Sequence, residues 1–108
     1  MTLYHYTCRH SAYSISHDRF ILRPGLTGLL WLTDLDVPDR RGLGLTSNFI
    51  ECDRTEFRFA VLNPVNVERW IDVRKSAPLL LVQALEADPK VLLTHWFLTG
   101  SAQRSEPV

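Results

Sequence analysis

In the stretch LYHYTCRH, residues 3–10, tyrosines stand at positions 4 and 6, and His5 lies between them. Successive side chains of a β-strand point to opposite faces of the sheet, so this spacing predicts a strand with two chemically different faces. One face is apolar and the other carries polar groups. The first face holds Tyr4, Tyr6 and Cys8, and the second holds Leu3, His5 and Thr7.

The segments that follow this strand in the sequence predict an α+β fold. Strands are expected at 28–35, at 55–62, where Phe57 and Phe59 face the core, and at 91–100. One short helix is expected directly after the first strand, and a second begins near Pro78. Because strands this close in sequence leave little room for crossover helices, we expect a small mixed, mainly antiparallel sheet with short helices.

The domain boundaries follow from the same elements. Residues 1–100 are expected to form a single domain, and residues 101–108 a C-terminal tail that frays. Residues 34–53 are rich in Asp, Gly, Arg and Pro without a clear period, which predicts a long surface loop. Long loops in compact domains are often functional.

Composition excludes several classes of function. The chain has 108 residues, 12 basic and 12 acidic side chains and a formal net charge of zero, so it lacks the field of a protein that binds duplex DNA through net charge. Phosphate-binding loops, dinucleotide-binding glycine motifs and the common zinc and hydrolase motifs are absent from the sequence. We expect neither a bound metal nor binding to a membrane.

The two cysteines, Cys8 and Cys52, are far apart and lack a CxxC spacing. This pattern indicates neither a zinc site nor a disulfide framework, and it favours a reduced protein. The N-terminal residues lack the basic and apolar regions of a signal peptide, and no long apolar run follows. We therefore expect a cytoplasmic protein.

Three motifs in the first third of the chain, residues 3–35, carry a resemblance to a known family. The motif LYHYT is followed by a short helix, by ILRPG and then by GLLWLTDL. This series resembles the opening of the ADP-ribosyltransferase-like superfamily, in which a first strand carries a histidine and a second strand carries an aromatic residue. The resemblance implies that fold and NAD as the cofactor.

The resemblance also implies roles for individual residues. His5 would hydrogen-bond the ribose of NAD, Tyr6 would grip the carboxamide through its backbone, and Thr7 would add a hydroxyl on the same strand. Trp31 would stack on the nicotinamide ring, where a cationic ring gains about 0.5–2 kcal/mol from the aromatic face, and Thr33 completes the second motif. We expect His5 and Trp31 on the same side of the sheet.

The expected catalytic residues are His5 and a glutamate. Members of the superfamily usually place that glutamate on a later strand, but VLLTHWFLTGSAQ contains none. Glu56 is our candidate, and Glu51 in the long loop is an alternative. A carboxylate there would stabilise the positive charge that develops at C1 of the nicotinamide ribose.

Three hypotheses for function follow. In the first, the protein binds NAD or a related nucleotide and transfers ADP-ribose to an unknown acceptor, which could be a protein, or hydrolyses NAD. In the second, it is a non-catalytic phage or mobile-element protein that inhibits a partner protein by direct binding. The third is RNA 2′-phosphotransferase-like chemistry, for which Arg9, Arg23 and Arg58 are the candidate anion-binding residues.

Each candidate site residue could also have a purely structural role. In that case His5 and Trp31 would lie in the core, and Glu56 would lie on a solvated face.

Overall fold

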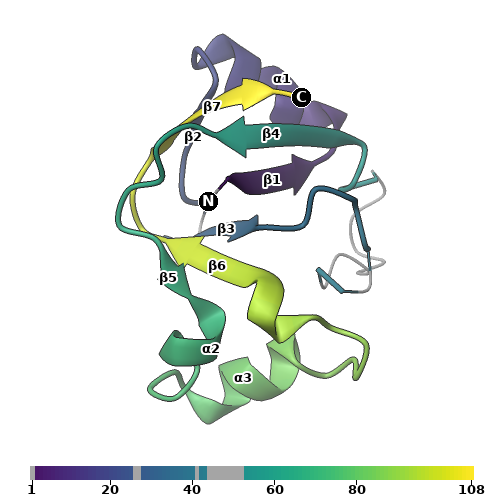
Figure 1. Cartoon of the computed structure of the whole chain (residues 1–108), viewed down its shortest axis with the longest axis vertical. Coiled ribbons are helices and arrows are strands. Elements are labelled where there is room, and N and C mark those ends of the chain that lie inside the picture. Colours follow the sequence, from purple (N-terminus) through teal and green to yellow (C-terminus); the bar gives the residue numbers. More distant parts are fainter. Residues whose placement is uncertain (1, 26–27, 41, 44–52) are drawn as a thin grey trace.

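Seven strands form one sheet with β1 at its centre (Figure 1). The computed structural model describes residues 2–25, 28–40, 42–43 and 53–108. The strand order is β2-β7-β4-β1-β3-β6-β5, and each pairing between neighbours is antiparallel. In chain order the elements are β1 (Leu3–Thr7), α1 (Arg9–His17), β2 (Ile21–Leu22), β3 (Leu30–Thr33), β4 (Phe57–Val61), β5 (Glu68–Arg69), α2 (Trp70–Val73), α3 (Leu79–Leu85), the 3-10 helix η1 (Leu93–His95), β6 (Trp96–Thr99) and β7 (Gln103–Pro107).

An α+β domain with an antiparallel sheet and short helices is thus confirmed, although the sheet is not mixed in the residues described. The helices expected after the first strand and near Pro78 are α1 and α3. Among the helices of the described ranges, none is long and apolar enough to cross a lipid bilayer.

The two faces of the sheet bury separate apolar clusters. Leu30 and Leu32 of β3 point to one face, where Ala12 and Ile15 of α1 cover them. Trp31 lies between these leucines in sequence and points to the other face, where α2 and α3 pack. Figure 1 shows α1 near one end of the sheet and α2 and α3 near the other.

Three tryptophans attach α2 and α3 to the sheet. The ring of Trp31 lies edge-on to the rings of Trp70 and Trp96, with centroids 5.5 and 5.9 Å away. The Trp70 indole N–H donates to Glu86 Oε2 at 2.9 Å. Arg74 also donates two hydrogen bonds to Glu86, at 2.8 and 2.7 Å, and holds the pKa of that carboxyl below its usual value.

The expectation of a C-terminal tail over residues 101–108 is wrong. Residues Gln103–Pro107 form β7, which lies between β2 and β4. Its buried polar side chains explain the pairing: the Gln103 amide donates to Val65 O at 2.7 Å, and the Ser105 hydroxyl donates to Phe20 O at 2.6 Å. The buried positions of β7 hold polar side chains that are hydrogen-bonded, so the segment lacks the alternating apolar pattern that usually marks a strand.

Three predicted strands are shorter in the structure. The segment 28–35 yields only β3, and 91–100 divides into η1 and β6. The segment 55–62 yields β4, because Thr55 is hydrogen-bonded to Asp53 in a turn, and Phe57 at its start is 40% exposed rather than in the core. The predicted loop over 34–53 contains residues outside the described ranges, and its described part from 34 to 40 contains no strand.

The Glu86 contacts generate a prediction about stability. Glu86→Ala should lower the free energy of unfolding by about 1–3 kcal/mol, because the buried Trp70 N–H loses its acceptor. Chemical denaturation measures this loss. Glu68→Ala, at an exposed position of β5, is the control and should change the value by less than about 0.5 kcal/mol. Equal effects of the two substitutions would contradict the role assigned to Glu86.

Candidate functional site

A cavity of about 830 Å³ lies along the facing edges of β1 and β3. Over their described residues the two strands share one paired position, Tyr4 with Thr33. The cavity is lined by every residue of 4–7 and every residue of 29–33. Residues on one face of a strand alternate, so unbroken runs from both strands mean that the cavity follows the strand edges. Its size falls in the range of small-molecule sites.

His5 bridges the two strands inside this region. Its ring Nδ1 lies 2.9 Å from the carbonyl oxygen of Trp31. Burial lowers the pKa of His5 below its ordinary value of 6.5, so the ring is neutral at pH 7. A carbonyl oxygen only accepts hydrogen bonds, so Nδ1 carries the ring proton and Nε2 is left as an acceptor.

The expectation that His5 and Trp31 point to the same side of the sheet is wrong. Tyr4 is paired with Thr33, so these two side chains share a face, and Trp31 lies on that face too. His5 is paired with Phe59, which belongs to the cluster beneath α1 on the opposite face. A shift of one residue in register exchanges the two faces of a strand, and the alternation within each segment did not reveal the register between them.

Trp31 has a different environment from the one its motif implies. Its ring packs edge-on against Trp70 and Trp96 in the cluster beneath α2 and α3. The residue is partly buried and lines the cavity, and its carbonyl oxygen holds His5. A ligand ring would therefore meet an indole that is already held by two neighbours.

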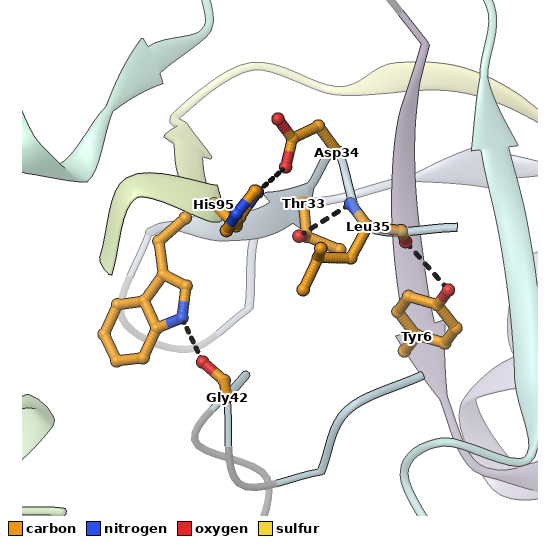
Figure 2. Close-up of polar contacts among 7 residues, drawn as sticks. Tyr6, Thr33, Asp34, Leu35, Gly42 and His95 are labelled. Atoms are coloured by element: carbon orange, nitrogen blue, oxygen red, sulfur yellow. Dashed lines mark hydrogen bonds and ion pairs between the residues drawn. The ribbon is translucent and has the colours of Figure 1, made fainter. Parts of the chain in front are cut away.

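The hydroxyls of Tyr6 and Thr33 are engaged with the chain that follows β3. Figure 2 shows the Tyr6 hydroxyl donating to Leu35 O at 2.8 Å, and the Thr33 hydroxyl accepting from Leu35 N at 3.1 Å. Burial raises the pKa of Tyr6, which keeps this hydroxyl protonated. Both residues line the cavity, as does the buried Thr7.

A histidine and an aspartate meet beside these contacts. His95 Nδ1 lies 2.6 Å from Asp34 Oδ1, and the Trp96 indole donates to the carbonyl of Gly42 at 2.8 Å (Figure 2). Neither His95 nor Asp34 is among the described residues that line the cavity. This pair was not a sequence candidate, because its members are 61 positions apart.

Glu56 is not brought into the cavity with the other candidates. It lies in the turn before β4 and pairs with Arg9 at 3.3 Å. The following residue, Phe57, is paired with Thr7, so Glu56 stands close to the Thr7 end of β1 without lining the cavity. The alternative, Glu51, lies outside the described residues.

Of the three arginines considered for anion binding, only Arg23 lines the cavity. Arg9 pairs with Glu56, and Arg58 donates to the carbonyl of Asp36 and lies over the Tyr4 ring. Sequence analysis missed two charged lining residues, Asp18 and Arg54. Neither residue belongs to a motif. The side-chain direction of Asp18 depends on where α1 ends, and that of Arg54 depends on the turn before β4.

The expectation of reduced cysteines is wrong for Cys8, which is disulfide-bonded. Cys8 is buried at the start of α1, and the other cysteine of the chain, Cys52, lies outside the described residues. Sequence spacing reveals local cysteine motifs, but it does not reveal contacts between distant segments. Within the described ranges, no three His, Cys, Asp or Glu side chains group as metal ligands.

The lowered pKa of His5 predicts how stability depends on pH. The unfolded chain binds a proton at His5 before the folded chain does, so the free energy of unfolding should fall as the pH drops below 6.5. This loss should stop once the pH is below the pKa of the folded state. Chemical denaturation at pH 7.5 and at pH 5.5 measures this loss. Between these two pH values the free energy of unfolding should fall less for His5→Gln, which keeps an N–H donor, than for the unsubstituted protein. Identical decreases in the two proteins would show that His5 is not the titrating group.

Comparison with known proteins gives no match to a family model, to a curated protein or to a solved structure. Function is therefore inferred from the cavity, from the residues that line it and from the sequence motifs.

Proposed function

We propose that this chain is an ADP-ribosyltransferase-like protein that binds NAD or a related nucleotide in the cavity between β1 and β3. The observation that carries the proposal is that all five residues selected from the motifs line this one cavity. They come from two segments separated by more than twenty positions in sequence. The residues are His5, Tyr6, Thr7, Trp31 and Thr33.

The neutral ring of His5 suits the ribose of such a ligand. Its Nδ1 is fixed by the Trp31 carbonyl, so Nε2 can accept a hydrogen bond from a ribose hydroxyl. Because the Trp31 bond orients the ring before a ligand arrives, little conformational entropy is lost on binding. The apolar lining from Ile15 and Leu30, on the same face as His5, would cover the less polar surface of the ligand.

The proposed reaction is substitution at C1 of the nicotinamide ribose. The bond between C1 and the nicotinamide nitrogen breaks, and its electron pair leaves with neutral nicotinamide. An acceptor or water forms the new bond to C1 and releases its proton to the solvent. Positive charge develops on the ribose, and a carboxylate near C1 would stabilise it. Glu56 remains our candidate for this carboxylate, and it would have to turn from Arg9 towards the cavity.

A second candidate function is inhibition of a partner protein by direct binding, without catalysis. Two exposed leucines favour it: Leu79 and Leu80 of α3 are 69% and 80% exposed. Exposed apolar side chains grouped on one helix are typical of protein-binding surfaces. The position of Glu56 outside the cavity also agrees with a protein that lacks turnover.

The nucleotide proposal predicts that NAD stabilises the fold. At 100 times its dissociation constant, NAD should add about 2.7 kcal/mol to the free energy of unfolding, which a thermal-shift titration detects. Ser14→Trp should abolish this shift, because Ser14 lines the cavity from an exposed position of α1 and the larger ring would occupy the space.

Tyr13→Trp is the matched control, since Tyr13 is 68% exposed and is not among the residues that line the cavity. It should keep the full shift. If millimolar NAD leaves the melting temperature of the unsubstituted protein unchanged, the proposal is wrong and inhibition by binding becomes the better hypothesis.

The role of Glu56 has its own test. Glu56→Gln preserves the shape of the side chain but removes its negative charge, so it should reduce release of nicotinamide from NAD by orders of magnitude and leave NAD affinity almost unchanged. Glu68→Gln, exposed on β5, should leave both quantities unchanged. An active protein whose rate survives Glu56→Gln must use another carboxylate.

A further inference from the structure

Arg54 has a buried guanidinium nitrogen without a hydrogen-bond partner. Its Nη2 atom is the single buried side-chain nitrogen or oxygen left unsatisfied in the described part of the chain. Burying part of a charged group without a partner is unfavourable, so such an atom requires an explanation. Arg54 also lines the cavity between β1 and β3.

The turn that carries Arg54 is held by other residues. Asp53 Oδ1 accepts from Thr55 N at 2.8 Å and from the Thr55 hydroxyl at 2.6 Å, and these bonds lower the pKa of Asp53. The same oxygen pairs with Arg40 at 2.9 Å. Asp53 is thus engaged elsewhere and does not neutralise its neighbour in sequence, Arg54.

No acidic side chain in the described lining neutralises Arg54 either. Asp18 is the one acidic residue among the described lining residues, and it pairs with Arg23 at 3.4 Å. With two arginines against one aspartate, the described part of the lining carries a surplus positive charge at Arg54. A cavity with an unpaired guanidinium selects anions, and the planar fork of arginine suits the oxygens of a phosphate.

We propose that Arg54 is a phosphate-binding residue of this cavity and holds the pyrophosphate of the nucleotide. This inference rests on the proposed function and adds a residue that the sequence motifs do not contain. Arg54 lies three positions before Phe57, which is paired with Thr7, so it enters near the Thr7 end of β1. His5 would meet a ribose, and Arg54 the phosphates linked to it.

The test compares three probes by calorimetry: NAD, inorganic pyrophosphate and nicotinamide, which has no phosphate. Arg54→Met should weaken binding of NAD and pyrophosphate about 10- to 100-fold, the range expected for lost hydrogen bonds to a charged group, and leave nicotinamide affinity unchanged. Arg54→Lys keeps the charge but not the fork and should give a smaller loss. Arg104→Met, which removes an exposed arginine of β7 outside the described lining, is the control and should change none of these affinities.

The melting temperature of each ligand-free variant provides a second measurement. If Arg54 stabilises the fold, its replacement should lower the melting temperature. If its charge is buried and unpaired, its replacement should leave the melting temperature unchanged or raise it. A marked decrease in ligand-free Arg54→Met and Arg54→Lys, with affinities unchanged, would overturn the inference.

The outcomes also separate this inference from the proposed function. If pyrophosphate binds through Arg54 but NAD does not bind, Arg54 is a phosphate ligand and the NAD proposal fails. If NAD binds equally well to the unsubstituted protein and to Arg54→Met, the NAD proposal stands and the role of Arg54 is wrong. Absence of binding by both NAD and pyrophosphate overturns both.

Discussion

The hydrogen bond from His5 to the carbonyl oxygen of Trp31 lies where the central pairing of the sheet is thinnest. Strands β1 and β3 share one paired position, so the half of the sheet with β4 and β7 meets the half with β6 and β5 over a short contact. A side chain there joins the two strands without filling the space between them. The same bond therefore joins the two parts of the sheet beside the cavity that follows the edges of β1 and β3.

The two faces of the sheet are buried by different means. The face beneath α1 is buried by aliphatic and phenyl side chains of β1, β3, β4 and β6. The opposite face, beneath α2 and α3, is held by three indoles and by the contacts of Glu86. The cluster beneath α1 includes Leu3 of β1 and Leu32 of β3, so apolar packing also crosses the boundary at which the two strands share one paired position. The cavity follows this boundary, and its described lining combines apolar residues of both strands with Asp18, Arg23 and Arg54.

Local patterns in the sequence were sufficient for some elements and not for others. The alternation in residues 3–7 and around Phe59 predicted β1 and β4, because one side of each strand is apolar. Register between strands is a relation between distant segments, and for that reason the side of Trp31 was predicted wrongly. Strand β7 was not predicted, because its buried side chains are the polar Gln103 and Ser105. Arg54 was not predicted as a cavity residue, because the turn between Asp53 and Thr55 sets the direction of its side chain. All five candidate positions still line one cavity, because the cavity follows the adjacent edges of β1 and β3, the two strands that carry the motifs.

The position of β7 between β2 and β4 has a consequence for how quickly this domain folds. Ile21 pairs with Arg104 and Leu22 with Gln103, so β2 enters the sheet only when segments about eighty positions apart have met. Closing loops of that length slows folding, and domains dominated by such non-local pairings fold on a scale of roughly milliseconds to seconds. Until β7 arrives, the outer edge of β4 presents unpaired backbone groups, which makes the partly folded chain prone to self-association through that strand.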